Sequence, residues 1–131
     1  MRVGTDSPPL ARGRTVAYWA TTLLVAAELG VGGVWDILRT PFVRSIIDHL
    51  GYPAYFPLFM GAWKIPGAVV LLIPRRPRLK EWAYAGFVFT MTGAVASHLA
   101  VGDGASALIA PVTLLALALA SWALRAPPRR L

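Results

Sequence analysis

The sequence predicts an all-α membrane protein, built as one bundle of four transmembrane helices with a short amphipathic helix in its first outer loop. Composition supports the membrane class, because 56% of the 131 residues are hydrophobic and only 15% are charged. Water-soluble domains carry about 25% charged residues. The composition also excludes a disordered chain, which would be polar and rich in charge. A chain of this length holds one domain.

Four apolar segments, at residues 15–38, 54–73, 81–101 and 105–124, provide the second observation. Each has roughly the 20 residues that a helix needs to cross a bilayer, and proline, glycine and charged residues separate them. Continuous apolar runs favour helices over the alternating strands of a barrel. A signal peptide is the alternative for the first segment, but the run is longer than the apolar part of a signal peptide. Residues 15–125 are the membrane domain, between basic tails at 1–14 and 126–131 that we expect to be mobile.

The loop after the first segment contains a short amphipathic pattern at residues 41–50. Phe42, Ile46 and Leu50 recur at four-residue spacing, and polar residues occupy the positions between them. This spacing predicts a short helix that lies on the membrane surface or caps the bundle.

The basic residues predict the orientation in the membrane. Ten of the 13 Lys and Arg residues lie before the first segment, between the second and third, or after the fourth, whereas only Arg39 and Arg44 lie on the opposite side. Because positive residues remain cytoplasmic, we expect a cytoplasmic-membrane protein with both termini in the cytoplasm. The net charge of +7 is therefore mainly a topology signal. Nucleic acid is not an expected partner, because no recognition motif accompanies the charge.

Several ionisable residues fall inside or beside the predicted spans. Glu28 and Lys64 lie near the middle of the first two segments, and Asp36, His98 and Asp103 lie toward the outside. Such groups are costly in lipid, so we expect them to converge inside the bundle. Glu28 and Lys64 form the natural pair. They would act either as a structural salt bridge or as a pair that handles protons or orients a substrate.

His98 has the intrinsic pKa of a general acid or base, although a hydrogen-bonded histidine at the interface is the alternative. A metal held by His98 would need Glu28, Asp36 or Asp103, and no closely spaced ligand motif supports one, so no metal is predicted. The absence of cysteine removes disulfides, thiolate sites and iron–sulfur clusters. No nucleophile elbow, phosphate loop or dinucleotide motif is present.

Small and polar residues lie near these groups, notably Gly32 and Gly61 and a stripe of Thr90, Gly93 and Ser97. They would allow tight helix packing or leave room for a ligand. The candidate catalytic residues are Lys64, His98 and Glu28. The candidate substrate-binding residues are Asp36, Asp103, Trp35, Thr90 and Ser97.

A series of motifs resembles the DoxX-like family of small four-helix membrane proteins over about residues 15–125. The motifs are His49-Leu50-Gly51-Tyr52-Pro53, Lys64 with Gly67-Ala68, Ile73-Pro74, residues 78–87, Thr92-Gly93-Ala94, Ser97-His98 and Gly102-Asp103. The family takes its name from a subunit of an archaeal thiosulfate:quinone oxidoreductase, so the resemblance implies a helical bundle near quinone or lipophile chemistry. A thiol mechanism does not carry over to a chain without cysteine. The family supplies no agreed catalytic set.

The leading expectation is a protein that binds a small lipophilic molecule, for example a quinone, in a polar-centred pocket, as an oxidoreductase subunit or accessory protein. A second hypothesis is a self-sufficient membrane enzyme, an isomerase or a hydrolase of an apolar substrate, that uses Lys64 or His98 as acid or base. A third is an oligomeric transporter or assembly subunit. The expected partners are the lipid bilayer, the lipophilic molecule, and a second copy or a partner membrane subunit.

Overall fold

The computed structural model describes residues 9–127 and residue 130, and all regular elements in that part of the chain are helical. The long helices are α1 (Pro9–Leu38), α3 (Phe56–Leu72), α4 (Pro77–Ala100) and α5 (Ile109–Ala123). The short α2 (Pro41–Leu50) follows α1, and a 3-10 turn, η1 (Ala105–Leu108), precedes α5. The predicted all-α class is therefore confirmed.

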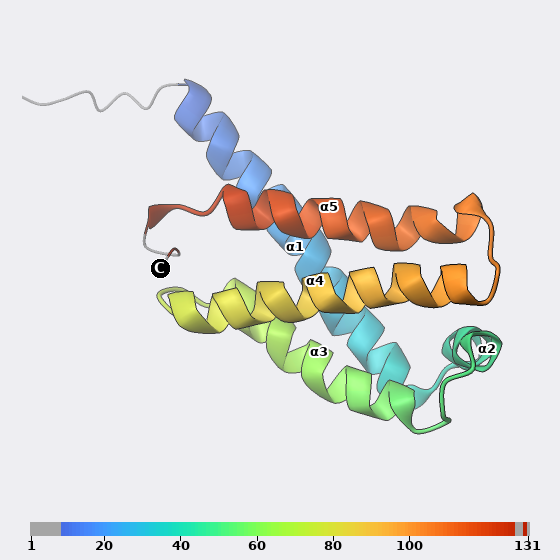
Figure 1. Cartoon of the computed structure of the whole chain (residues 1–131). Coiled ribbons are helices and arrows are strands. Elements are labelled where there is room, and N and C mark those ends of the chain that lie inside the picture. The colour runs from blue at the N-terminus through green and yellow to red at the C-terminus, as the bar shows by residue number, and fades with distance from the viewer. Residues whose placement is uncertain (1–8, 128–129, 131) are drawn as a thin grey trace, which may run out of the picture.

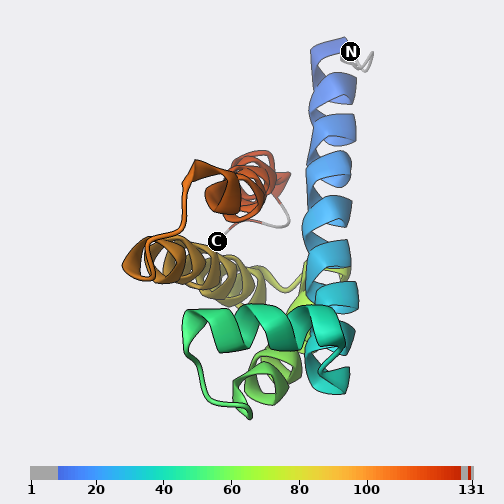
Figure 2. The same cartoon turned by 90° about the vertical axis from the view of Figure 1, so that its right-hand side faces the viewer.

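The helices form two pairs that cross one another. α4 and α5 run side by side in opposite directions, and α1 crosses them obliquely (Figure 1). α1 packs most extensively against α3, whereas the contact between α3 and α4 is much smaller. α2 lies across one end of the bundle (Figure 2), which we call the α2 end. The N-terminal part of α1, the loop between α3 and α4, and the chain after α5 lie toward the other end, the termini end.

Local sequence explains where the helices begin and end. The predicted amphipathic helix is confirmed as α2: the Thr40 side chain accepts a hydrogen bond from the Val43 amide at 3.3 Å, and Gly51 ends the helix with a φ of 84°. α1 begins at Pro9 rather than at residue 15, and α4 begins at Pro77 rather than at residue 81. Proline fits the first turn of a helix, where its missing N–H is not needed. Residues 1–8, 128–129 and 131 of the predicted tails lie outside the described residues.

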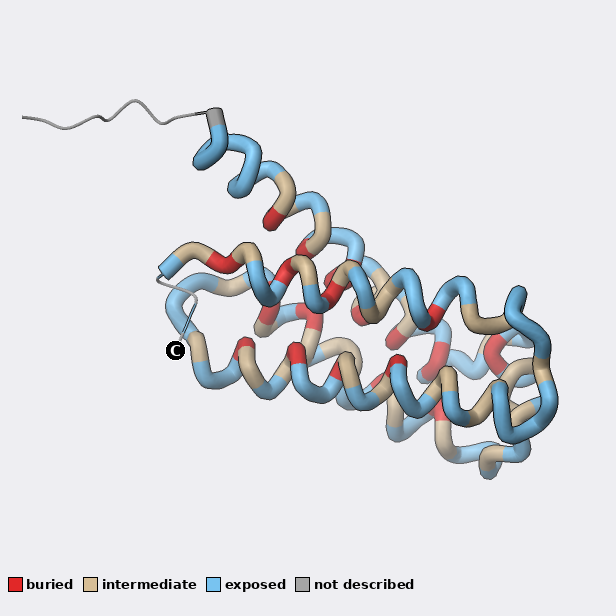
Figure 3. Tube along the Cα trace, turned by 45° about the horizontal axis from the view of Figure 1, so that its top comes forward, coloured by how far each residue is buried: buried red, intermediate tan, exposed pale blue. Residues whose placement is uncertain are grey.

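The interior is narrow and the exterior is apolar. A buried cluster of side chains from the four long helices forms the core: Val25, Leu29, Ala68, Leu71, Tyr84, Phe87, Met91 and Ala118. Buried positions lie where the helices face one another, and the outward faces are exposed (Figure 3). Those faces carry large apolar side chains, including Trp63 at 67% and Phe89 at 73% exposure. An apolar exterior on a helical bundle is what a lipid environment requires.

Two stretches, Leu10–Leu38 and Ala105–Ala123, are long and apolar enough to cross a membrane by length and composition. Helix α3 is apolar but shorter. Helix α4 has 24 residues, with Arg78, Lys80 and Glu81 near its start, and does not belong to that group. Two of the four predicted spans thus meet the length and composition of a membrane-spanning helix, and the four-span bundle is not confirmed.

Candidate functional site

A cavity of about 1320 Å³ lies between the α1–α3 pair and α4, with α2 at one end. The lining is mostly apolar and rich in aromatic side chains. Of the residues that the sequence singled out, seven line this cavity: Glu28, Trp35, Asp36, Lys64, Thr90, Ser97 and His98. The eighth, Asp103, is hydrogen-bonded to His98. Residues from three helices, α1, α3 and α4, therefore meet around one space.

Lys64 lies between two carboxylates of α1 on the cavity wall. Its Nζ is 3.0 Å from Asp36 Oδ2 and 3.5 Å from Glu28 Oε1. The side-chain exposures are 12% for Lys64, 12% for Asp36 and 23% for Glu28. The expected contact between Glu28 and Lys64 is present. Asp36, which the sequence placed toward the outside of the membrane, makes the shorter contact. We call Glu28, Lys64 and Asp36 the ion triad.

Glycines make the ion triad possible. A Cβ on Gly32 would lie 2.6 Å from Glu28 Oε1, so this glycine leaves room for the Glu28 carboxylate to lie along the helix. A Cβ on Gly61 would lie 2.5 Å from the Gly33 carbonyl oxygen, which shows how closely α1 and α3 approach. Lys64 follows Gly61 by one turn and so reaches α1 easily. Gly93 differs, because a Cβ there meets nothing within 4 Å and the residue lines the cavity.

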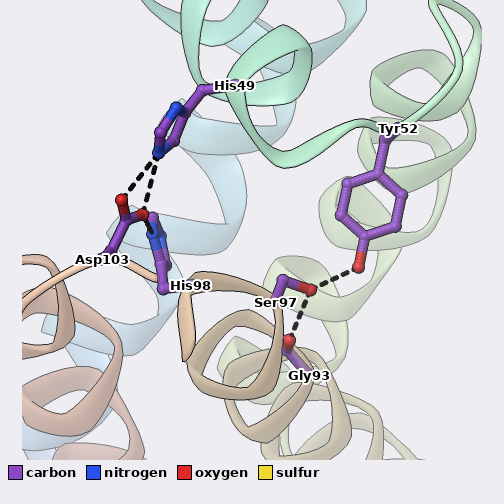
Figure 4. Close-up of polar contacts among 6 residues, drawn as sticks. All are labelled: His49, Tyr52, Gly93, Ser97, His98 and Asp103. Carbon is purple, nitrogen blue, oxygen red and sulfur yellow. Dashed lines mark hydrogen bonds and ion pairs between the residues drawn. The ribbon is translucent and has the colours of Figure 1, made fainter. Parts of the chain in front are cut away.

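Asp103 joins two histidines at the α2 end (Figure 4). Its carboxylate contacts His49 Nε2 at 2.8 and 3.0 Å and His98 Nδ1 at 2.7 Å. The hydrogen bond from His98, and then the one from His49, hold the pKa of Asp103 below its ordinary value of 3.8. Since His49 belongs to α2 and His98 to α4, this His49–Asp103–His98 clasp fastens α2 to the α4–α5 pair.

A second link at the same end involves Tyr52 and Ser97, whose hydroxyl oxygens are 2.5 Å apart. Ser97 donates to the Gly93 carbonyl at 2.8 Å, so Tyr52 donates to Ser97 (Figure 4). The Tyr52 ring stacks on Phe56 with centroids 4.3 Å apart. Thr90 likewise donates to a carbonyl of its own helix, that of Gly86, at 2.8 Å. The hydroxyl hydrogens of Thr90 and Ser97 are therefore already engaged, and each oxygen retains accepting capacity.

The sequence-based reasoning missed a polar group near the termini end. Lys80 is fully buried and donates to the carbonyls of Val70 and Leu71 at 2.8 and 2.9 Å. This lysine therefore satisfies the last carbonyls of α3 and joins α3 to α4. Nearby, the hydroxyl of Ser121 contacts those of Tyr84 at 2.7 Å and Thr22 at 2.6 Å.

His49 was also missed as a partner, because its position in the outer loop gave no indication of what it would meet. The only indication in the sequence is that His49, His98 and Asp103 all lie in or beside the two loops that are predicted on the outer side of the membrane. Within the described residues, no group of three or more His, Cys, Asp or Glu residues is arranged to hold a metal ion.

We expect Asp103→Asn to destabilise the protein in a pH-dependent way. A carboxyl group whose pKa is lowered by folding stabilises the folded state above its ordinary pKa, and this contribution is lost as the pH falls through the folded pKa. The thermal-unfolding midpoint of Asp103→Asn should therefore lie below that of the wild type at neutral pH. The difference should disappear as the pH falls below 3.8. Asp48→Asn, which changes an exposed residue of α2, is the control. If the unfolding midpoints of Asp103→Asn and the wild type still differ in acid, that result would contradict the clasp.

Comparison with known protein families finds a match over most of the chain. The DoxX-like family model matches residues 20–121, a range that contains the ion triad, the clasp and the whole lining of the cavity. Neither the curated proteins nor the solved structures contain a significant match to the chain.

Proposed function

Because the chain belongs to the DoxX-like family, we propose that it is a membrane-embedded protein that binds a small lipophilic molecule in the cavity between α3 and α4. The observation that carries this proposal is the cavity itself, with its mostly apolar lining and an ion triad on its wall. Ligand sites typically combine an apolar enclosure with a few polar groups that orient the ligand.

In this proposal all four long helices cross the membrane. The 24 residues of α4 extend about 36 Å and the 17 residues of α3 about 26 Å, against about 30 Å of hydrocarbon. Large apolar side chains are exposed on all four helices. Among the described residues, the start of α1, the loop between α3 and α4 and the segment after α5 carry most of the Lys and Arg residues, and these three parts lie toward the termini end. This distribution supports a cytoplasmic termini end and an outward-facing α2 end.

Cysteine labelling tests this topology, and the cysteine-free chain needs no background removal. Asp48→Cys on α2 should react with a membrane-impermeant maleimide in intact cells. Arg76→Cys, in the loop between α3 and α4, should react only after permeabilisation. Labelling of both positions from one side would contradict the four-span arrangement.

The ligand would enter the cavity from the bilayer. Several aromatic residues that line the cavity are also exposed on the outer surface, among them Phe59, Trp63, Trp82 and Phe89. Once inside, an apolar body would lie against these side chains and a polar end would reach the ion triad. A quinone is a neutral candidate, because the Lys64 ammonium can donate to a carbonyl. Binding of a quinone would support a role as a subunit or accessory protein of an oxidoreductase.

Native mass spectrometry of gently extracted full-length protein tests the proposal. We expect one stoichiometric lipophilic molecule per chain, distinct from the bulk lipid, and an absorption spectrum would reveal a quinone. A protein that carries bulk lipid alone would argue against a resident ligand.

A further inference from the structure

We infer that the preferred ligand of the cavity is a lipophilic cation, an apolar molecule with one positive charge. This inference rests on the proposed function, because it concerns the same cavity and names the class of molecule that fits it. Three features support it: the sum of charges on the wall, the position of Glu28, and the aromatic lining.

The ion triad carries one more negative charge than positive charge. Glu28 and Asp36 contribute two carboxylates, and Lys64 is the only lysine or arginine among the described residues that line the cavity. His98 also lines it, but His98 shares Asp103 with His49. Even with both histidines protonated, the triad and the clasp together have no net positive charge. An excess carboxylate beside a mostly apolar cavity in a membrane is costly, and a bound cation would offset that cost.

Glu28 is the carboxylate that remains available to a ligand. Lys64 lies closer to Asp36, at 3.0 Å, than to Glu28, at 3.5 Å. Asp36 Oδ2 is buried, and among the described residues it meets no donor besides the Lys64 ammonium. The Glu28 side chain is about twice as exposed as that of Asp36 and lines the cavity. A cation could therefore approach Glu28 from the side that Lys64 does not occupy.

The rest of the lining suits a positive charge spread over an apolar body. Aromatic rings from α1, α2, α3 and α4 surround the cavity, namely Trp35, Phe42, Phe59, Trp63, Trp82 and Phe89. The face of an aromatic ring attracts a cation, and the attraction grows when water is excluded. A volume of about 1320 Å³ is large enough for a bulky molecule. An anionic amphiphile would find the same apolar surface but would be repelled by the excess carboxylate.

Two probes of nearly the same size and shape but opposite charge provide the test. Tetraphenylphosphonium and tetraphenylborate are titrated into the purified full-length protein by calorimetry, with protein-free detergent as the blank. A neutral short-chain quinone is the third probe. We expect tetraphenylphosphonium to bind at least about tenfold more tightly than either of the others, since only the cation gains from the excess charge.

Substitutions test whether Glu28 causes the preference for the cation. Glu28→Gln removes the excess charge and leaves Lys64 paired with Asp36, so it should weaken tetraphenylphosphonium binding about tenfold and leave tetraphenylborate binding unchanged or stronger. Asp48→Asn removes an exposed carboxylate outside the cavity and should change neither. Size-exclusion chromatography confirms that each variant is folded.

The outcomes separate the two proposals. Equal affinity for the two ions, tighter binding of the quinone, or an unchanged Glu28→Gln variant would overturn the cation preference while leaving a lipophile-binding cavity. If none of the three probes binds, the proposed function fails together with the inference.

Discussion

Lys64→Met is expected to destabilise the protein by about 3–5 kcal/mol, the usual cost of removing one partner from a buried ion pair. The change leaves Glu28 and Asp36 on one face of α1, beside a mostly apolar cavity and with no positive charge between them. The thermal-unfolding midpoint in detergent should fall sharply, which circular dichroism can follow. Methionine keeps most of the volume of lysine, so the loss should come from charge rather than from packing.

A triple variant without charges tests whether the instability of Lys64→Met comes from its unpaired carboxylates. Replacing Glu28, Asp36 and Lys64 by Gln, Asn and Met removes every charge of the ion triad together, so no unpaired charge is left beside the cavity. We expect the triple variant to unfold at a higher temperature than Lys64→Met alone. If Lys64→Met unfolds at the wild-type temperature, the ion triad does not stabilise the bundle.

Gly61→Ala is the second change with a large expected effect. The added Cβ would lie 2.5 Å from the Gly33 carbonyl oxygen and 2.6 Å from Ile37 Cγ1, so α1 and α3 would have to separate. Forcing atoms into a tight contact costs about 1–3 kcal/mol. The separation would also draw Lys64 away from α1, so that binding of a cavity ligand should weaken together with stability.

Gly86→Ala is the matched control, because a Cβ at this position of α4 meets nothing within 4 Å. Alanine is a better helix former than glycine by about 0.5–1 kcal/mol, so the control should be neutral or slightly stabilising. Gly61→Ala is therefore expected to lower the unfolding midpoint, whereas Gly86→Ala should leave it unchanged or raise it slightly. A Gly61→Ala variant as stable as Gly86→Ala would contradict the close α1–α3 approach.

Much of the fold could be predicted because hydrophobic periodicity and helix-breaking residues are local features of the sequence. The α2 helix follows from the four-residue spacing of Phe42, Ile46 and Leu50, and the structure places it within the predicted bounds. Helix starts are less predictable, because a proline such as Pro77 can separate two helices or occupy the first turn of one. The sequence therefore predicts Lys80 as a basic residue of the loop, whereas in the structure it is buried against the end of α3.

In the candidate site, too, the sequence predicts which residues share a helix face but not which residues of different helices meet. Glu28, Gly32 and Asp36 recur at four-residue spacing, so their shared face could be deduced from the sequence. That Lys64 would lie nearer to Asp36 than to Glu28 depends on how α3 crosses α1, which no local pattern specifies. The His49–Asp103 contact is similar, because it joins residues 54 positions apart through the packing of α2.

The most direct test of the central claim is to fill the cavity and ask whether the ligand is lost. Gly93→Phe would project a ring into the cavity from α4, whereas Gly13→Phe adds the same ring on α1 away from the lining. Native mass spectrometry would compare the lipophilic molecules retained by the wild type and both variants. We predict a stoichiometric molecule in the wild type and in Gly13→Phe, and its loss in Gly93→Phe. Retention of that molecule in a folded Gly93→Phe variant would contradict binding in this cavity.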